Sequence, residues 1–499
     1  MKASPTLFGD RRMLIDGRMI ESSNGSWIES INPATEEILG RVPAASLDDV
    51  NTAVMAADRA WPAWAGLAVE KRGLYLRKLA DMLETRADEL VNMEVLDTGI
   101  TISKIRADIG SACRMLRYYA GLGLELKGES VPATPNNIHF SLREPYGVVG
   151  RIIPFNHPLQ FAASKIAAPL IAGNAVVLKP SEQSPLTATV LAELCAEIFP
   201  PGVINIVTGL ADAGVALTRH PSVRRLALIG SPQTGMAMQR AAAETGVKHI
   251  TLELGGKNPS IVFPDADLAL VTDAAIAGMN FGHQGQSCGS LSRLFLHDSL
   301  YDRVLADVVK RVEALRVGDP MDPHTQMGAM NSQQQYERVL HYIRAGLEDG
   351  ASLVAGGSRP SGKKFEKGYW IQPTVFADVT PEMRIFREEI FGPVLSVIRW
   401  SETDDVIRMA NSTQYGLTAA IWTQDIRTAF QTARRIQSGY ISINGRPGHF
   451  PGVSFGGVKN SGLGTEEGFD EVLSYTVPKV INIILPVDNH HALNTSKPQ

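Results

Sequence analysis

The sequence predicts an α/β fold built around two parallel sheets, with a few strands detached from both. From residue 146 onwards, short apolar runs rich in β-branched residues alternate with helical patterns. The same alternation resumes after residue 256, and two further β-rich segments stand apart from either series. Because a strand–helix–strand rhythm is typical of a parallel sheet covered by helices, two such series favour two sheets.

The first series contains the expected strands "YGVVGRIIP", "NAVVLKP", "VINIVTG", "VRRLALIGS" and "KHITLELGG". The second contains "SRLFLH", "PVLSVIRW" and "GYISING", with "YDRVLADVVKRVEALRVG" as a helix between them. The segment "NNIHFSLREPYGVV" predicts a β-hairpin, and "YTVPKVINIILP" predicts a strand with Pro478 inside it, which suits a sheet edge. Detached strands of this kind usually pack on a neighbouring subunit. The polar end of the chain indicates a tail rather than a metal site at His490 and His491.

Length and composition indicate a multi-domain protein. The chain has 499 residues, 44% of them hydrophobic and 20% charged, so we expect two or three domains. Its 48 basic and 52 acidic side chains give a net charge of −4, and no basic run would follow a nucleic acid backbone. No apolar run reaches the ~20 residues that cross a bilayer, and the N-terminus has no signal-peptide core. These features argue against nucleic acid and membrane as partners and favour the cytoplasm.

Cys288 differs from the other two cysteines, Cys113 and Cys195. Those two fall within helical periodicity, where a free thiol is usually a small buried hydrophobe. Cys288 stands in "FGHQGQSCGSLSR", a turn-forming segment in which Ser287 and Gly289 leave the sulfur approachable. Such a thiol is a candidate nucleophile, but with a reference pKa of about 8.5 it needs a lowered pKa or a neighbouring base. An odd number of cysteines without metal-ligand spacing favours a reducing compartment and predicts no metal site.

Five further blocks accompany "GQSC" in a fixed order. They are "PFNHP", "KPSEQSP" and "LELGGK" before it, and "EEIFGPV" and "SFGGVKNSG" after it. Each block alone is moderately specific, whereas six in register over residues 154–462 form a strong signature. The sequence resembles the aldehyde dehydrogenase superfamily, of the NAD(P)-dependent, non-acylating type. The resemblance implies a Rossmann-like parallel-sheet cofactor domain, a second α/β catalytic domain and a small β oligomerisation extension.

The resemblance also implies where these parts lie. We expect residues 1–125 and 146–256 to form the NAD-binding domain and residues 257–460 to form the catalytic domain. Residues 126–145 and 461–499 would supply the oligomerisation strands and a C-terminal tail. The assembly implied is a homotetramer or a homodimer.

The resemblance implies four catalytic residues and a route through a thioester. Cys288 would add to the aldehyde to form a thiohemiacetal, whose carbon can release a hydride. Asn156 in "PFNHP" would donate its side-chain N–H to the oxyanion, beside the backbone N–H of Cys288; one such donor is commonly worth ~3 kcal/mol. Glu253 in "LELGGK" would activate the water that hydrolyses the thioester. Lys165 matches a lysine near the family's active site.

Three of these residues have ordinary alternatives. Asn156 could cap the helix that follows it, a common use of asparagine. Glu253 could pair with Lys257 at the i,i+4 spacing of a surface helix. Cys288 could form a hydrolase dyad with His283, although the sequence shows no third orienting group. The accompanying blocks favour the catalytic interpretation in each case.

The cofactor assignment rests mainly on the resemblance, because the chain contains no G-x-G-x-x-G fingerprint. The turn "GSPQTG" opens a helix whose N-terminus suits a pyrophosphate, although an ordinary strand-to-helix turn is the alternative. In "KPSEQSP", Lys179 and Glu182 would contact the adenine ribose. A carboxylate there binds a free 2′-hydroxyl and repels a 2′-phosphate, so we expect NAD, with NADP possible but less preferred. The cofactor-binding residues implied are Ile152, Pro154, Phe155, Lys179, Glu182, Gly209, Gly230, Ser231, Gly235, Leu254, Gly255, Glu389 and Phe391.

Some positions depart from the family's usual pattern. His157 stands where many relatives have an aromatic residue, and Gly282 replaces a frequent asparagine. Ser164 stands where betaine-type enzymes carry the aromatic residue of a cation cage. Thr465 replaces one member of a common arginine–glutamate pair, which puts a proton relay through Glu466 in doubt. We expect a largely apolar substrate tunnel to which His157 adds one polar group. Its candidate walls are Phe155, Phe161, Phe450 and Phe455.

Two other functions remain open. A CoA-acylating semialdehyde dehydrogenase would pass the acyl group to CoA, and Glu253 argues against it because a base for water is dispensable there. A non-catalytic NAD-binding protein of the same fold would not need Cys288, Glu253 and Asn156 together. The sequence leaves the aldehyde itself undetermined.

Overall fold

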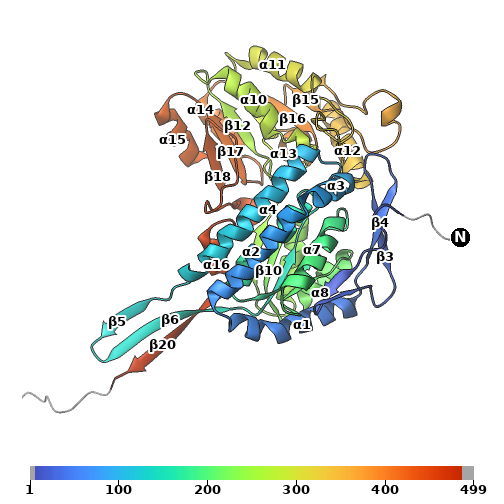
Figure 1. The fold of residues 1–499 in the computed structure, drawn as a ribbon. Helices are drawn as coiled ribbons and strands as arrows, with labels where there is room; N and C mark the ends of the chain where they lie inside the picture. The colour runs from blue at the N-terminus through green and yellow to red at the C-terminus, as the bar shows by residue number, and fades with distance from the viewer. Residues whose placement is uncertain (1–5, 486–499) are drawn as a thin grey trace, which may run out of the picture.

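The first of two large sheets contains eight strands in the order β19-β11-β10-β7-β8-β9-β1-β2. The computed structural model describes residues 6–485, and Figure 1 shows the chain in this range. The five central strands run parallel, and the edge strands β19, β1 and β2 are antiparallel to their neighbours. The strands are β1 (Met13–Ile15), β2 (Arg18–Ile20), β7 (Val148–Ile152), β8 (Ala175–Lys179), β9 (Ile204–Ile206), β10 (Val223–Ile229), β11 (His249–Glu253) and β19 (Gly462–Leu463).

The second sheet contains seven strands in the order β14-β15-β16-β13-β12-β17-β18. All neighbours in it are parallel except β14 and β15. The fold class predicted from the two alternating series is therefore present as two parallel-strand sheets. The strands are β12 (Pro259–Val262), β13 (Arg293–His297), β14 (Ser352–Ala355), β15 (Thr374–Ala377), β16 (Val394–Trp400), β17 (Thr418–Trp422) and β18 (Tyr440–Ile443).

Helices cover these sheets, and the long α4 lies across the middle of the molecule in Figure 1. The helices are α1 (Leu47–Ala65), α2 (Val69–Thr85), α3 (Ala87–Thr98), α4 (Ile102–Leu122), α5 (Pro158–Ser164), α6 (Ala167–Ile171), α7 (Leu186–Ile198), α8 (Ala211–Arg219), α9 (Pro232–Ala243), α10 (Leu268–Gly278), α11 (Tyr301–Glu313), α12 (Gln333–Glu348), α13 (Arg384–Arg387), α14 (Thr403–Asn411), α15 (Ile426–Arg435) and α16 (Phe469–Ser474). Short 3-10 turns are η1 (Gly123–Glu125), η2 (Phe281–His283), η3 (Lys363–Phe365) and η4 (Lys459–Ser461). Among residues 6–485, no helix has the length and apolar character needed to span a membrane.

A three-stranded arm extends from the body (Figure 1). It pairs β20 (Thr476–Ile484) with β6 (Asn137–Pro145), and β6 with β5 (Ser130–Thr134). The segment "NNIHFSLREPYGVV" does not form the predicted hairpin by itself, because it supplies β6 and, from Val148, the start of β7 of the first sheet. The hairpin partner of β6 is β5, which precedes that segment. Pro478 lies in β20 at the edge of the arm, where its missing N–H costs no internal ladder bond. A separate ribbon pairs β3 (Trp27–Ile31) with β4 (Ile38–Pro43). His490 and His491 lie outside the described residues.

The order of the first sheet determines where a ligand can bind. The chain passes from β7 to β8 and β9 on one side and then returns to place β10 on the other side of β7. Ligands of open α/β sheets bind outside the carboxyl ends of the strands at such a reversal. The loops that follow β7 and β10 contain the "PFNHP" and "GSPQTG" segments, so the topology brings two distant motifs to one edge.

Candidate active site

Two cavities at this edge meet at Cys288. A junction cavity of about 260 Å³ is lined by Cys288, Asn156 and Phe391 among others. A polar cavity of about 460 Å³ lies on the other side of the sulfur and is lined by Cys288, Glu253 and several further polar side chains. Cys288 therefore contacts both spaces, and a group bound in one can reach a group bound in the other across its thiol.

Two hydrogen bonds from Asn258 hold the loop that carries Cys288. The Asn258 side-chain amide donates to the carbonyl of Cys288 at 2.7 Å and to that of Ser290 at 2.8 Å. Cys288 is half-buried, whereas Cys113 and Cys195 are buried as the sequence predicted. Burial, followed by the nearby carboxylates, raises the pKa of the Cys288 thiol to about 12. Without bound substrate or cofactor, the Cys288 thiol is therefore protonated at neutral pH.

Asn156 points an amide into the junction cavity. It is buried, and its Oδ1 has no hydrogen-bond partner in the described chain. Helix α5 begins at Pro158 after His157, and no side chain caps its N-terminus. The helix-cap alternative for Asn156 is therefore wrong.

Glu253 ends β11 with both carboxylate oxygens buried and without partners in the described chain. Burial, and then the charge of Glu466, raises the pKa of Glu253 well above its usual value. The alternative pairing with Lys257 is wrong because Glu253 lies in a strand, and the Nζ of Lys257 is itself buried without a partner among the described residues. Glu253 is thus a carboxylate with free proton-accepting capacity beside the polar cavity.

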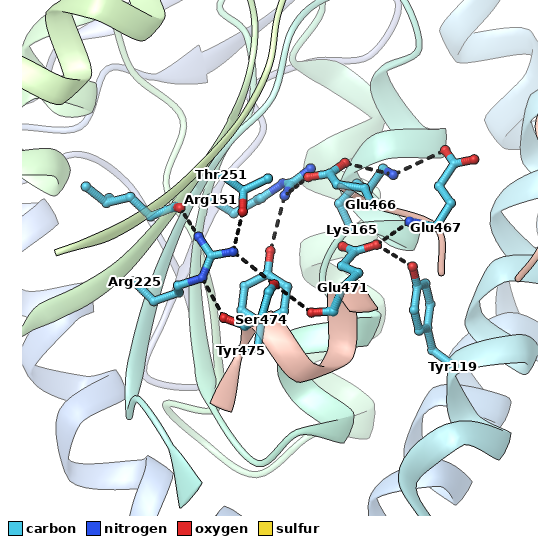
Figure 2. A network of polar contacts seen from close by, with 11 residues as sticks. Tyr119, Arg151, Lys165, Arg225, Thr251, Glu466, Glu467, Glu471, Ser474 and Tyr475 are labelled. Carbon is cyan, nitrogen blue, oxygen red and sulfur yellow. Dashed lines mark hydrogen bonds and ion pairs between the residues drawn. The ribbon is translucent and has the colours of Figure 1, made fainter. Parts of the chain in front are cut away.

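Lys165 belongs to a buried ion cluster (Figure 2). Its Nζ lies 2.9 Å from Glu466 Oε2 and 3.3 Å from Glu467 Oε1. Arg151 on β7 donates to Glu466 at 2.6 Å, and the backbone N–H of Glu467 donates to Glu471 at 2.7 Å. Burial opposes ionisation of Glu466, but Arg151 and Lys165 lower its pKa to about 2. Glu466 is therefore an anion held by two cations.

Glu389 and Phe391 form the floor of the junction cavity. The Glu389 carboxylate accepts from the Gly256 N–H at 2.8 Å. A Cβ on Gly255 would lie 2.2 Å from that carboxylate, and one on Gly256 would lie 2.6 Å from the Cys288 carbonyl, so each "LGG" glycine permits a different close approach. Phe391 adopts a φ of 60°, a left-handed conformation uncommon for an aromatic residue, and its ring packs edge-to-face on Phe155 at 5.7 Å.

A third space, the helix cavity of about 560 Å³, continues from the junction cavity to the N-terminus of α9. The Ser231 side chain caps α9 by accepting from the Thr234 N–H at 3.2 Å, so "GSPQTG" forms the predicted strand-to-helix turn. Lys179 ends β8 and pairs with Glu182 at 3.3 Å on the cavity wall. Ile152, Pro154, Phe155, Gly230 and Ser231 also line this cavity, and Leu254 and Gly255 line the junction cavity.

Two predicted cofactor residues line neither space. A Cβ on Gly235 would lie 2.9 Å from the Leu254 side chain, so Gly235 packs α9 against the sheet. A Cβ on Gly209 would lie 2.8 Å from the Cβ of Ala213. Both glycines allow close packing behind the cavity.

The polar cavity has the mainly apolar lining that the sequence predicted, but it carries more polar side chains than the single one expected. Phe161, Phe450 and Phe455 line it, whereas Phe155 lies on the other side, between the junction and helix cavities. The phenylalanine walls could be predicted because each phenylalanine is recognised individually in the sequence. The polar lining comes from single residues of distant segments, which include Asp108, Ser111, Arg114, His157, Gln160, Arg446 and His449.

Several buried charges near the site were not predicted from the sequence. Arg151, Arg225 and Glu471 belong to the cluster in Figure 2, and Asp108 lies between His157 and His283. The hydrolase dyad proposed for His283 is not formed, because its Nε2 faces Asp108 at 3.2 Å. The one available signal was an arginine inside the apolar strand "GVVGRIIP", since a charge there needs a buried partner.

Comparison with known proteins identifies the class. Residues 19–481 match the profile of the "Aldehyde dehydrogenase family". Aldehyde dehydrogenase tropH of Talaromyces stipitatus is 44% identical over 485 residues, covering 96% of this chain and 94% of that protein. The hydroxyisobutyraldehyde dehydrogenase of Mycolicibacterium austroafricanum is 40% identical over 475 residues, covering 95% of this chain and 94% of that protein. The NAD⁺ complex of an aldehyde dehydrogenase from Bacillus cereus is 39% identical, covers 96% of this chain and 98% of that chain, and has a TM-score of 0.93.

The chain belongs to the aldehyde dehydrogenase family. It is an NAD(P)-dependent, aldehyde-oxidising enzyme, and the prediction of this class and of its α/β fold is confirmed.

Proposed function

We propose that this enzyme oxidises its aldehyde to a carboxylic acid with NAD, through a thioester on Cys288 that water resolves. The position of Cys288 between two cavities supports this most directly. The aldehyde occupies the polar cavity and the nicotinamide end of the cofactor occupies the junction cavity. Incubation of the purified chain with NAD and a panel of aldehydes should yield NADH and the acid in equal amounts. Equal amounts of NADH and acyl-CoA, formed only when CoA is added, would contradict it.

The protein's own residues carry out the steps around the sulfur. As the Cys288 sulfur bonds to the carbonyl carbon, the thiol proton passes to water in the polar cavity, and the oxyanion of the thiohemiacetal lies beside the Asn156 amide. NAD, when bound, supplies the hydride acceptor. The thioester that remains is hydrolysed by water whose proton passes to Glu253, the buried carboxylate with no other partner in the described chain. Lys165 and Glu466 hold fixed charges near that carboxylate.

Replacing Asn156 with alanine should lower kcat by on the order of a hundredfold or more, the cost typical of one oxyanion donor. The melting temperature should change little, because the Asn156 side chain caps no helix. Steady-state NADH formation and thermal unfolding measure the two effects. A normal kcat with a lowered melting temperature would assign Asn156 a structural role instead.

The cavities fit NAD along their length. The helix cavity leads from Glu182 past the N-terminus of α9, whose positive dipole end suits a pyrophosphate. It adjoins the junction cavity, where Glu389 and Phe391 would contact the nicotinamide riboside. The NAD⁺ complex of the Bacillus cereus relative supports the same cofactor here. The Glu182 carboxylate favours a free ribose hydroxyl over a phosphate, so NADP is the weaker cofactor.

Glu182→Gln should raise the KM for NAD several-fold while improving the use of NADP. The substitution removes a charged hydrogen bond worth about 1.4 kcal/mol or more, a factor of ten, and removes repulsion of the 2′-phosphate. Values of kcat/KM for both cofactors at one ionic strength measure it. Glu197→Gln, which removes an exposed carboxylate elsewhere on α7, should change neither cofactor. A wild-type enzyme that prefers NADP would show that Glu182 does not contact the adenine ribose.

The three-stranded arm is the proposed oligomerisation element of a homotetramer or homodimer. Its apolar side chains face outward, with Val480 68% and Ile484 73% exposed. Such an arm gains stability by packing on a second copy. A monomeric mass measured by light scattering would contradict this assembly.

We assign residues 1–125 and 146–256 to the NAD-binding domain and residues 257–460 to the catalytic domain. We also propose that the enzyme works in the cytoplasm.

A further inference from the structure

Asp108, His157 and His283 form a cluster beside the polar cavity, and Asp108 and His157 line the cavity itself. Asp108, on α4, accepts from His157 Nδ1 at 2.6 Å and from His283 Nε2 at 3.2 Å through the same oxygen, Oδ2. The two imidazole rings are 4.4 Å apart. His157 directly follows Asn156, and His283 lies in the turn that leads to Cys288. The cluster thus ties together three segments around the reacting thiol.

The contacts determine which nitrogen of His157 is free. Burial alone would keep Asp108 neutral, but His157 and His283 lower its pKa well below the usual range, so it is an acceptor for both rings. Burial lowers the pKa of His283 to about 4, so that ring is neutral and donates through Nε2. His157 donates through Nδ1, which leaves the Nε2 of its neutral form as a hydrogen-bond acceptor.

That acceptor is open to the cavity. The Nε2 of His157 has no hydrogen-bond partner among the described residues and is not buried. Ser111 and Gln160, whose side chains lie 3.5 Å apart, line the same wall and supply donors. The ring of Phe161 packs edge-to-face on His157 at 5.3 Å, and two further phenylalanines, Phe450 and Phe455, line the cavity. The site therefore offers an acceptor and donors between aromatic faces.

We propose that His157, held by Asp108, selects aldehydes that carry a phenolic or enolic hydroxyl group on a planar ring. The inference deepens the proposed aldehyde oxidation and rests on it. The substrate hydroxyl donates to His157 Nε2 and accepts from Ser111 or Gln160, while its ring packs on the phenylalanine walls. An acidic hydroxyl makes the stronger bond to an imidazole backed by a carboxylate. A carboxylate on the substrate is the main competitor, because Arg114 and Arg446 also line the cavity, but it would make no use of the acceptor on His157.

The same three residues could be considered as metal ligands, since their ligand atoms lie within 4.8 Å of one another. A metal-bound imidazole normally donates its second N–H to an outer partner. The Nδ1 of His283 is buried and has no partner in the described chain. The hydrogen-bonded arrangement accounts for the cluster without an ion.

The test compares matched substrates in one enzyme. We would measure kcat/KM with saturating NAD for benzaldehyde and for its three hydroxy, three methoxy and three carboxy derivatives. At least one hydroxy isomer should exceed its methoxy counterpart by about tenfold or more, the size of one well-placed hydrogen bond. His157→Phe should reduce that ratio to about one. The ratio is independent of any general loss of activity caused by a change beside Asn156.

Two further variants keep the test decisive. Asp108→Asn keeps the size of the side chain but removes its charge, and should lower the hydroxy-to-methoxy ratio to an intermediate value. His449→Phe changes another histidine of the same cavity, one already bonded to Glu467 at 2.9 Å, and should leave the ratio unaltered. Treatment with a chelator should also leave it unaltered.

A hydroxy-to-methoxy ratio near one for all three isomers would overturn the inference, as would a preference for the carboxy series. A ratio that stays high in His157→Phe, or falls to one in His449→Phe, would also overturn it. So would a ratio that falls on treatment with a chelator and recovers when zinc is added. Each of these outcomes can be observed only if the enzyme oxidises benzaldehyde or its derivatives. Failure to form NADH from any aldehyde, including short aliphatic ones, would instead contradict the proposed function.

Discussion

Replacing Cys288 with alanine should reduce kcat/KM for aldehyde oxidation by on the order of 10⁴-fold or more, the scale on which nucleophile removal acts in other covalent enzymes. The thiol makes the covalent bond to the substrate, and no other cysteine among residues 6–485 lines either cavity that meets there. NAD binding, followed by calorimetry, should be largely retained because the helix cavity does not include Cys288. Residual turnover above a few per cent would remove Cys288 from the mechanism.

The chain offers matched controls for this change. Cys113 and Cys195 are buried, and burial is the main cause of their raised pKa values, about 11 for Cys113 and higher for Cys195. Cys113→Ala should keep its turnover number, because it removes a thiol from the core and not from a cavity. Alkylation followed by peptide mass spectrometry should modify Cys288 first in the free enzyme. Its rate should rise with pH, since burial holds the thiol protonated well above neutrality.

Three of the six sequence blocks lie at the carboxyl end of a parallel strand. "PFNHP" comes after β7, "KPSEQSP" begins at the last residue of β8, and "LELGGK" spans the end of β11. The strand pattern could be recognised locally from apolar runs, and parallel strands bring their carboxyl ends to one edge. Cys288 follows no such strand, so its meeting with Asn156 in one cavity was implied by the family resemblance and not by the strand pattern.

The polar network behind the site could not be predicted in this way. Arg151 and Glu466 are 315 positions apart, and His157 and Asp108 are 49 apart. Nothing in the local sequence around either residue names its partner, because the contact depends on how the sheets and α4 pack. The polar side chains of the tunnel lining were missed for the same reason. Its phenylalanines could be recognised one at a time, whereas its polar wall exists only once α4, α5 and the Cys288 loop are assembled.

Glu253→Gln should stall the enzyme after hydride transfer, releasing at most one equivalent of NADH per active site before slow turnover. Glutamine fills the same buried site but cannot accept the proton of the attacking water, a contribution of typically 10²–10⁴-fold. Rapid mixing measures the burst, and intact-mass spectrometry should detect the acyl group on the protein. Glu197→Gln, which removes an exposed carboxylate on α7, should show normal turnover.

The pH dependence provides a second readout of the same residue. Burial raises the pKa of Glu253 well above its usual value, so the carboxylate form, which is the active base, increases as pH rises towards that pKa. Thioester hydrolysis in the wild type should therefore accelerate with pH below that pKa, and Glu253→Gln should lose this dependence because glutamine has no proton to titrate. Rescue of the variant by added CoA would favour an acylating enzyme. An unaltered steady-state rate with water as acceptor would show that another group activates the water.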